Sequence, residues 1–427
     1  MGEVADWKPQ TSALKDCIEN MSERREPSAP ASLFGLVQPY AGDPILSLFE
    51  AFGADPRPDK INLGIGVYTD DQGRIPVLQS VLSAYERIGF GPQPYLPMEG
   101  HEGYRSAVRG LVFGHDHPAV EDDRVATIQT IGGTGALSVA ADFLARHCPD
   151  RMVYVSDPGW DNHHGLFQRA GLRTTSYPYW SEERHAIAFE RMKETLAQAN
   201  DGSIVVIQPV CHNPTGADLS LEQEEELTAV LLQKRHLVVF DMAYQGFGVG
   251  VSEDAGFVRR FAAKSQCLIA NSFSKNFSLY GQRCGGLSIV CGDTDEARRT
   301  LGQLKLVVRR SYSSPPATGG HLVAEILNAP VLREQWEAEV AGMRRRMQAM
   351  RSQLADAIEG LHDGFDTQFL REQRGMFSYT GLSAERVRQT RERDGVYLVE
   401  NGRICVAGLT DGNITAVAKC LARLHSA

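Results

Sequence analysis

The sequence has little of what directs a chain to a membrane or to nucleic acid. No apolar run approaches the roughly 20 residues needed to cross a bilayer. Lysine and arginine total 44 against 53 aspartate and glutamate residues, which gives a formal net charge of −9 without any dense basic block. The first residues also lack the basic-then-apolar order of a secretory signal. We therefore expect neither a membrane nor a nucleic-acid partner.

Cysteine is sparse and scattered. The eight cysteines include no C-x-x-C pair and no framework spacing, so the sequence predicts neither a zinc ribbon nor a disulfide scaffold, and no metal site. Most lie in apolar runs, as Cys267 does, and are typical of small buried thiols. Together with the missing secretory signal, this indicates a reducing, cytoplasmic compartment.

The 427 residues suggest two or three domains. Residues 1–32 mix charges, serine and proline with few large apolar residues, which is typical of a leader or a disordered arm; a short helix over 13–21 is the alternative. We predict a large domain over 71–330 and a smaller α/β domain built from 33–70 and 331–427. The smaller domain would include a long charged helix from Val331 to Leu361 and short strands near the C-terminus.

Short apolar runs alternate with helical patterns in the middle of the chain. The predicted strands are Val125–Ile131, Met152–Ser156, Ile204–Gln208, Leu237–Asp241, Leu268–Ser272 and Leu287–Cys291. Apolar spacing predicts helices in several of the gaps, notably over Glu222–Gln233 and Phe257–Ala263. This alternation is typical of an α/β fold with a mainly parallel sheet covered on both faces.

Ligands of open parallel sheets bind at the carboxyl ends of the strands, so the polar residues there are candidates for a site. Gly132, Gly133 and Thr134 follow the first predicted strand and precede a helix, which suits either an anion site or a tight turn. Asp241 ends another strand and is either a helix cap or a functional carboxylate. Lys275 follows a buried strand, where an ammonium group is costly unless it has a partner or a function.

Together these residues match the needs of a pyridoxal phosphate site. Such a site needs a lysine for a Schiff base, a carboxylate for the pyridine nitrogen, a phosphate cradle and a flat group against the ring. The residues that supply these groups, in that order, are Lys275; Asp241; Gly133, Thr134, Ser272 and Arg283; and Trp160.

Several motifs resemble those of one family. They are AGDPIL at 41–46, NLGIGVY at 62–68, GGTGAL at 132–137, HNPTG at 212–216, DMAYQG at 241–246 and SFSKNFSLYGQR at 272–283. On these motifs the chain, from about Tyr40 to Leu424, resembles the class I aminotransferases of the aspartate aminotransferase family. YLPMEG at 95–100, VRRSYSSPP at 308–316, RGMFSYTG at 374–381 and CVAG at 405–408 are similar to the bacterial aromatic amino acid (tyrosine) branch.

The resemblance implies fold type I of the pyridoxal phosphate-dependent transferases, with a seven-stranded, mainly parallel sheet in the large domain. It also implies a ping-pong transfer of an amino group between an aromatic or dicarboxylic L-amino acid and 2-oxoglutarate. Lys275 would hold the cofactor and shuttle the substrate proton. Asp241 would pair with the pyridinium, with His163 behind it, and Tyr244 and Asn213 would bind the phenolic oxygen.

The remaining roles implied by the resemblance concern the phosphate and the substrate. Trp160 would stack on the ring, while Gly133, Thr134, Ser272 and Arg283 would bind the phosphate. Tyr95 from a neighbouring subunit would join them. Gly66, Trp160, Asn213 and Arg403 would contact substrate, with Arg403 clamping the α-carboxylate. Arg309, again from the neighbour, would meet a side-chain carboxylate. Sites shared in this way require a homodimer.

Three departures from the family pattern leave the preferred substrate open. Gln208 stands where histidine is common, and Gln282 where glutamate commonly precedes the phosphate-binding arginine. His164 and Gly165 are also not the usual continuation after His163. A specialised enzyme of this fold, acting on an unusual amino acid by transamination, β-elimination or decarboxylation, is the alternative. The S-x-x-K of Ser272 and Lys275 suits a serine acyl-transfer enzyme, but its S-D-N and K-T-G partners do not occur.

Overall fold

The computed structural model describes residues 34–40, 42, 44–89, 91–92, 94–362 and 366–425. The chain divides into two units, Met1–Asp43 and Pro44–Ala427. In the first unit the described residues contain a turn in which the Val37 N–H donates to the Phe34 carbonyl at 3.0 Å. The leader predicted over 1–32, with its alternative helix over 13–21, lies outside the described residues.

All of the described helices and strands lie in the second unit. The α-helices are α2 (Pro44–Ala54), α3 (Gln79–Ile88), α4 (Glu102–Phe113), α5 (Pro118–Glu121), α6 (Gly132–His147), α7 (Asn162–Arg169), α8 (Phe189–Gln198), α9 (Leu221–Gln233), α10 (Gly256–Ala262), α11 (Thr294–Ser311), α12 (Ala317–Asn328), α13 (Pro330–Glu359), α14 (Gln368–Glu372), α15 (Ala384–Asp394) and α16 (Ile414–His425). The strands are β1 (Ile61–Asn62), β2 (Val125–Ile131), β3 (Val153–Asp157), β4 (Thr174–Pro178), β5 (Trp180–Ser181), β6 (Ala186–Ile187), β7 (Ile204–Ile207), β8 (Leu237–Met242), β9 (Cys267–Ser272), β10 (Cys284–Val290), β11 (Phe377–Tyr379), β12 (Val396–Tyr397) and β13 (Arg403–Cys405). Three short 3₁₀ turns are η1 (Glu253–Ala255), η2 (Tyr280–Gln282) and η3 (Val406–Gly408).

A seven-stranded sheet forms the centre of the fold, in the order β2-β10-β9-β8-β7-β3-β4. From β9 through β4 neighbouring strands are parallel, whereas β10 pairs antiparallel with both β2 and β9. The predicted α/β class with a mainly parallel seven-stranded sheet is therefore confirmed.

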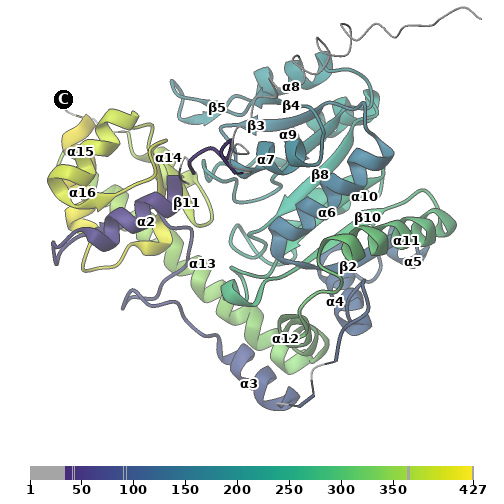
Figure 1. The fold of residues 1–427 in the computed structure, drawn as a ribbon. Coiled ribbons are helices and arrows are strands. Elements are labelled where there is room, and N and C mark those ends of the chain that lie inside the picture. The colour runs from purple at the N-terminus through teal and green to yellow at the C-terminus, as the bar shows by residue number, and fades with distance from the viewer. Residues whose placement is uncertain are drawn as a thin grey trace, which may run out of the picture. The chain divides into compact units, whose positions relative to one another are not determined.

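Helices cover both faces of this sheet because its strands are apolar on both sides. Along β8, Val238 and Phe240 belong to one buried core cluster and Val239 belongs to another. The second cluster includes residues of α6, α7 and α11, and the first includes residues of α4, α8, α9 and α10. α6 lies along β8, β9, β10 and β2, as Figure 1 shows.

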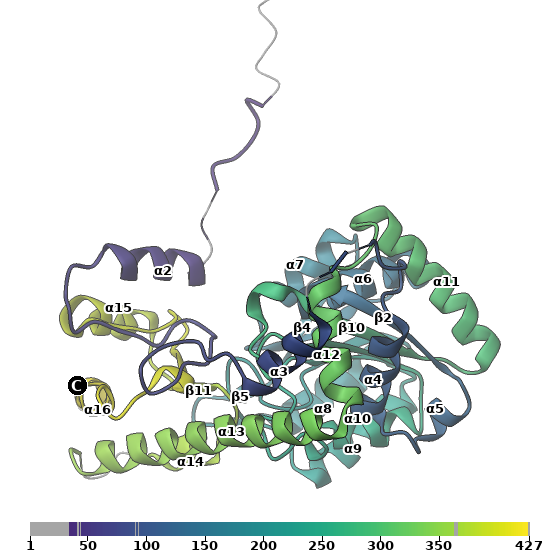
Figure 2. The ribbon, with the colours of Figure 1, turned by 90° about the horizontal axis from the view of Figure 1, so that it is seen from below.

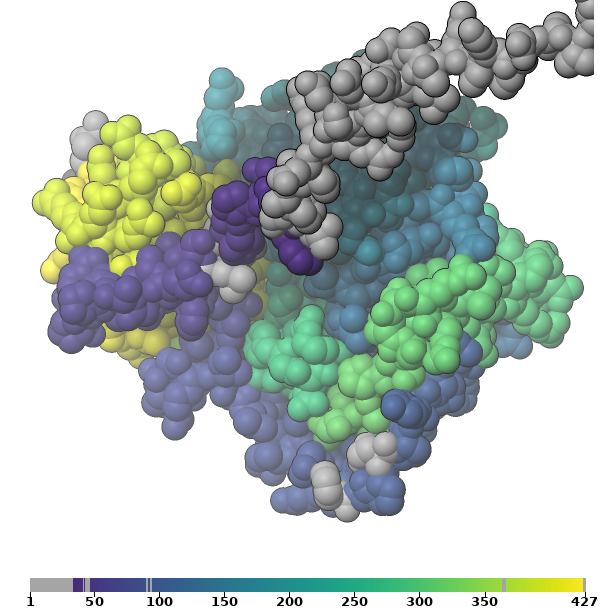
Figure 3. All heavy atoms as spheres, in the orientation of Figure 1, coloured from purple at the N-terminus to yellow at the C-terminus, as the bar shows by residue number. Residues whose placement is uncertain are grey.

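The C-terminal part of the chain packs with the segment that follows Pro44. β1 pairs parallel with β12, and β11 pairs antiparallel with β13. Leu48 of α2 joins Tyr397 and Val399 in a small core cluster, and Figure 3 shows α2, in purple, beside the yellow C-terminal residues. Within this unit, residues after Pro44 thus contact the C-terminal segment, and the smaller domain predicted from 33–70 and 331–427 stays a prediction.

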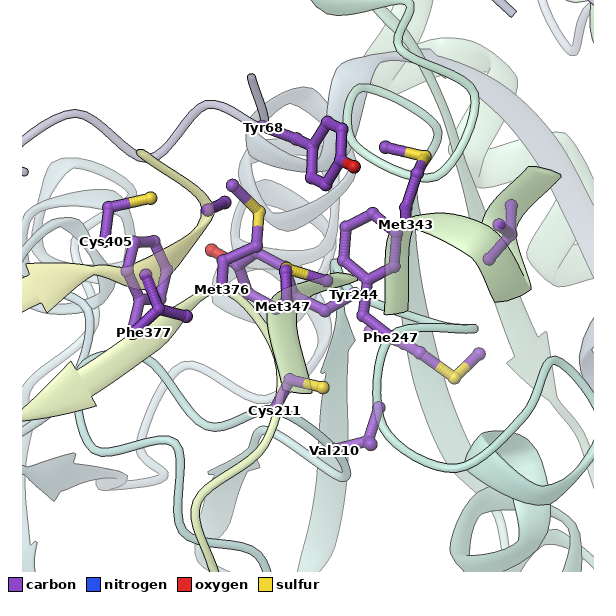
Figure 4. Packing of buried hydrophobic residues seen from close by; sticks show 14 of the residues in the cluster. Tyr68, Val210, Cys211, Tyr244, Phe247, Met343, Met347, Met376, Phe377 and Cys405 are labelled. Atoms are coloured by element: carbon purple, nitrogen blue, oxygen red, sulfur yellow. The ribbon is translucent and has the colours of Figure 1, made fainter. Parts of the chain in front are cut away.

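The long helix α13, predicted over 331–361, connects the two parts of the unit. It packs on α3 and α12 and, further along, on α14 and α16, and Figure 2 shows it running from beside the C-terminal elements to α12 near the middle of the view. Its side chains Met343 and Met347 are buried near Tyr68, Tyr244 and Phe247 (Figure 4). This packing joins α13 to the loop that carries Tyr244.

Trp336 of α13 is fully buried and holds the segment around Lys275. Its Nε1–H donates to the Asn276 carbonyl at 2.8 Å, and its ring stacks on Phe277 with centroids 4.4 Å apart. Trp336→Ala should therefore lower the free energy of unfolding by about 3–5 kcal/mol, measured by urea denaturation. Val331→Ala, on the exposed side of the same helix, should change it by less than about 0.5 kcal/mol. Equal effects of both changes would contradict this role of Trp336.

Among the described helices, none has both the length and the apolar character that a membrane crossing requires.

Candidate functional site

The carboxyl ends of the parallel strands surround a pocket of about 230 Å³. Its lining residues are Gly66, Gly133, Thr134, Trp160, Gln208, Asn213, Asp241, Ala243, Tyr244, Ser272, Ser274, Lys275, Tyr280 and Arg283. Because β10 runs opposite to its neighbours, its first residue lies beside Ile131 at the end of β2. The reversed strand therefore brings Arg283, directly before β10, to the edge where the other strands end.

One end of the pocket has the character of an anion site. α6 begins at Gly132, and among the described residues no side chain caps its first turn. A Cβ added at Gly133 would lie 3.0 Å from the Cβ of Ser272, so glycine allows the helix end and Ser272 to approach closely. Arg283 completes this end, and its Nη2 lies 2.7 Å from where a Cβ of Gly132 would be. Helix N–H groups, a hydroxyl and a guanidinium together suit a phosphate.

The amine of Lys275 lies inside the pocket. Its Nζ is 4.9 Å from the centroid of the Tyr244 ring. Withdrawal from water lowers the pKa of Lys275; Asp241 opposes this shift, while Arg283 and Arg403 add to it. A lowered pKa increases the fraction of neutral, nucleophilic amine at neutral pH. Burial also raises the pKa of Tyr244, which keeps its hydroxyl protonated.

Asp241 is a buried carboxylate with a fixed orientation. The distance from His163 Nε2 to Asp241 Oδ2 is 2.9 Å, and both side chains are buried. The Trp160 ring meets His163 edge to face, with centroids 5.2 Å apart. The result is a carboxylate that faces the pocket, supported from behind by an imidazole and flanked by an indole that lines the same pocket.

Arg403 is buried next to the pocket without a carboxylate partner among the described residues. Its Nη1 donates to Asn213 Oδ1 at 3.0 Å and its Nη2 to the Gly64 carbonyl at 2.7 Å. The Phe377 ring lies under the guanidinium, 4.3 Å from Cζ. The buried Nε has no hydrogen-bond partner in the described part of the chain. A buried guanidinium held only by neutral groups suits a small carboxylate ligand.

The structure brings most of the predicted site residues together. Ten of them line the pocket: Gly66, Gly133, Thr134, Trp160, Asn213, Asp241, Tyr244, Ser272, Lys275 and Arg283. His163 and Arg403 contact pocket residues from outside the lining. Tyr95, with 96% of its surface exposed, and Arg309, which is also exposed, do not line the pocket of their own chain.

The sequence did not indicate Ser274 and Tyr280 as pocket residues. Ser274 lies two residues beyond Ser272, and its N–H donates to the Ser272 hydroxyl at 3.4 Å. Tyr280 lies on η2 and accepts a hydrogen bond from the Tyr68 N–H at 2.9 Å. The two-residue spacing of Ser272 and Ser274 after a predicted strand could have indicated Ser274 as a pocket residue, whereas nothing in the local sequence marks Tyr280.

The chemistry of the lining fits a phosphorylated aldehyde with a basic ring nitrogen. The pocket offers an amine, a carboxylate, an indole and an anion cradle, which are the groups that pyridoxal phosphate needs. Among the described residues, no group of three or more His, Cys, Asp or Glu side chains could hold a metal ion.

Comparison with known proteins finds close relatives. The family model described as aminotransferase class I and II matches residues 58–421. The aromatic-amino-acid aminotransferase of Escherichia coli (strain K12) is 49% identical over 394 residues, which cover 91% of this chain and 99% of that protein. An aromatic-amino-acid aminotransferase from Burkholderia pseudomallei, covalently bound to pyridoxal phosphate, is similar in structure with a TM-score of 0.90 at 44% identity, covering 92% of this chain and 100% of that one. A psychrophilic aromatic amino acid aminotransferase from Psychrobacter sp. B6, cocrystallised with aspartic acid, has a TM-score of 0.91 at 43% identity, with coverage of 92% and 100%.

Proposed function

The chain belongs to the class I and II aminotransferase family, and from this we propose a pyridoxal phosphate-dependent aminotransferase that acts on aromatic and dicarboxylic L-amino acids with 2-oxoglutarate as acceptor. The two half-reactions would use one pocket in turn, in a ping-pong cycle. The observation that carries the proposal is the meeting of Lys275, the Asp241–His163 pair and the anion cradle in one pocket, with Arg403 beside it.

The residues of the pocket divide the chemistry between them. Pyridoxal phosphate, when bound, supplies an electron-withdrawing ring that accepts the electrons released from the substrate α-carbon. Gly133, Thr134, Ser272 and Arg283 would hold the phosphate. Asp241 would keep a proton on the ring nitrogen, because a buried carboxylate favours a cation beside it.

Proton transfer is assigned to the amine of Lys275. With its pKa lowered, the Nζ of Lys275 would hold the cofactor, and as a free base it would move a proton between the substrate α-carbon and C4′ of the cofactor. Tyr244, whose ring lies 4.9 Å from this nitrogen, would donate from its hydroxyl and orient the reacting groups. Trp160 would limit the movement of the ring.

Arg403 would fix the α-carboxylate that every amino acid and 2-oxo acid substrate carries. Asn213 Oδ1 and the Gly64 carbonyl hold one side of the guanidinium, and two N–H groups directed at one carboxylate set its orientation. The Phe377 ring under the guanidinium adds a cation–π contact. This arrangement would position the substrate α-carbon for Lys275.

We propose a homodimer with shared sites. Tyr95 and Arg309 are exposed and lie outside the pocket of their own chain, which supports a role at the pocket of a partner subunit. In that role Tyr95 would bind the phosphate, and Arg309 would bind the side-chain carboxylate of a dicarboxylic substrate. The described cysteines are all free, which supports the expected cytoplasmic location.

Arg309→Leu should change the substrate preference. Loss of a charge-assisted contact should lower kcat/KM for aspartate relative to phenylalanine by at least about tenfold. The measurement is kcat/KM for both amino acids with 2-oxoglutarate held constant. Arg310→Leu changes the next exposed residue of α11 and should leave the ratio within about twofold. Equal losses on both substrates would remove Arg309 from this role.

An amino-donor panel tests the proposed function as a whole. Purified protein loaded with pyridoxal phosphate is given tyrosine, phenylalanine, tryptophan, aspartate or other amino acids, and the formation of glutamate from 2-oxoglutarate is measured. We expect glutamate from the aromatic amino acids and from aspartate. Release of ammonia or carbon dioxide without formation of glutamate would contradict transamination and would indicate elimination or decarboxylation instead.

A further inference from the structure

We infer that Gln208 is a positioning residue for the substrate carboxylate, acting through Asn213 and Arg403. The inference rests on the proposed function for the identity of the anion at Arg403. Gln208 follows β7 directly, is buried and lines the pocket. It stands where histidine is common in the family, so its contacts are a property of this chain.

Gln208 closes a ring of two hydrogen bonds on the backbone of Asn213. Its Nε2 donates to the Asn213 carbonyl at 3.0 Å, and its Oε1 accepts from the Asn213 N–H at 3.0 Å. All four atoms are buried, so both bonds are shielded from competing water. One side chain thus fixes both polar groups of a single residue.

The rest of this loop has other supports. Asp218 accepts from the Cys211 N–H at 2.9 Å and from the His212 N–H at 3.0 Å. The His212 ring nitrogens lie 3.0 Å from the Ser156 hydroxyl and 2.9 Å from the Thr215 hydroxyl. Removal of Gln208 would therefore release Asn213 specifically and leave the neighbouring residues held.

Asn213 transmits this constraint to Arg403. Asn213 Oδ1 accepts a hydrogen bond from Arg403 Nη1 at 3.0 Å, and the Gly64 carbonyl accepts one from Arg403 Nη2 at 2.7 Å. A displaced Asn213 would remove one of the two acceptors that orient the guanidinium. The carboxylate would then meet a less well-placed arginine, and its affinity would fall.

Histidine does not reproduce the ring of two bonds. The amide of glutamine presents a donor and an acceptor side by side, whereas the two imidazole nitrogens point in divergent directions. A histidine at 208 keeps at most one of the two bonds to Asn213. Gln208→His should therefore give a smaller defect than Gln208→Leu, which keeps neither.

The test measures the affinity of the loaded enzyme for glutarate, a dicarboxylate that has no amino or oxo group to react. Gln208→Leu should raise the Kd of glutarate by at least about tenfold, equivalent to about 1.4 kcal/mol, and Gln208→His by at least about threefold. KM should rise for both phenylalanine and 2-oxoglutarate, since both carry an α-carboxylate, with a smaller change in kcat.

Gln129→Leu is the matched control. Gln129 is also a buried glutamine that bridges two backbone groups, with Nε2 donating to the Pro316 carbonyl at 2.8 Å and Oε1 accepting from the His101 N–H at 3.4 Å. It does not line the pocket. Its loss should lower the Tm while leaving the glutarate Kd within about twofold of wild type.

A double-mutant cycle separates positioning from general damage. In an Arg403→Ala background, Gln208→Leu should not weaken glutarate binding further, because the group that it positions is gone. A wild-type Kd in Gln208→Leu would overturn the inference; if that variant does not fold, a wild-type Kd in Gln208→His does the same. Wild-type protein that does not bind glutarate at all would instead count against the proposed function.

Discussion

Lys275→Ala should abolish amino transfer, with a loss of at least about four orders of magnitude in kcat/KM, or about 5 kcal/mol in the barrier. Lys275 is the one lysine among the described residues that line the pocket. Its removal takes away both the covalent anchor of the cofactor and the base that moves the α-proton. No neighbouring amine is present in the described lining to replace it.

The control for this experiment is Lys264→Ala. Lys264 is exposed and precedes β9, the strand that leads to Lys275. Its loss should leave kcat/KM within about twofold of wild type. A Lys275→Ala protein that retains activity within about tenfold of wild type would remove Lys275 from the mechanism.

Asp241→Asn should lower kcat/KM by about three orders of magnitude or more while the protein stays folded. The amide has nearly the same shape as the carboxylate but carries no charge, so it does not hold a proton on the ring nitrogen of the cofactor. It also replaces the charged acceptor that lies 2.9 Å from His163 Nε2. Steady-state kinetics with phenylalanine and 2-oxoglutarate measures the loss.

Asp157→Asn is the matched control for Asp241→Asn. Asp157 is an exposed carboxylate at the end of β3, a strand of the same sheet, and its change should have an effect below about twofold. Asp241→Asn activity within about tenfold of wild type, about 1.4 kcal/mol in the barrier, would contradict the assigned role.

The strands that carry the site could be predicted from the sequence because they are buried on both faces. Continuous apolar runs rich in β-branched residues, such as Leu237–Phe240, are typical of strands in a covered sheet. Such runs placed Asp241 and Ser272 at strand ends, and the structure has both residues there.

Other features of the sheet had no such signal. β4 was not predicted, since Thr174–Pro178 is mostly polar and only partly buried. The reversed direction of β10 was also not predicted, because an apolar run has no direction and only the sheet pairing defines it.

The site shows a similar division. Lys275 and Asp241 followed from their position near strand ends and from their chemistry, whereas the role of Asn213 was implied only by the family resemblance. The contact between Arg403 and Asn213 joins residues 190 positions apart and follows only from the fold. Tyr280 enters the pocket from a 3₁₀ turn that no periodic pattern marks. The roles of Tyr95 and Arg309 depend on a second chain, so they stay predictions.

The most direct test of the account locates the covalent attachment of the cofactor. Protein loaded with pyridoxal phosphate is reduced with borohydride, digested with a protease and analysed by mass spectrometry. The account predicts a phosphopyridoxyl group on Lys275 and loss of the visible absorption band on reduction. A label on a different lysine, or loaded protein in which reduction labels no lysine, would contradict it.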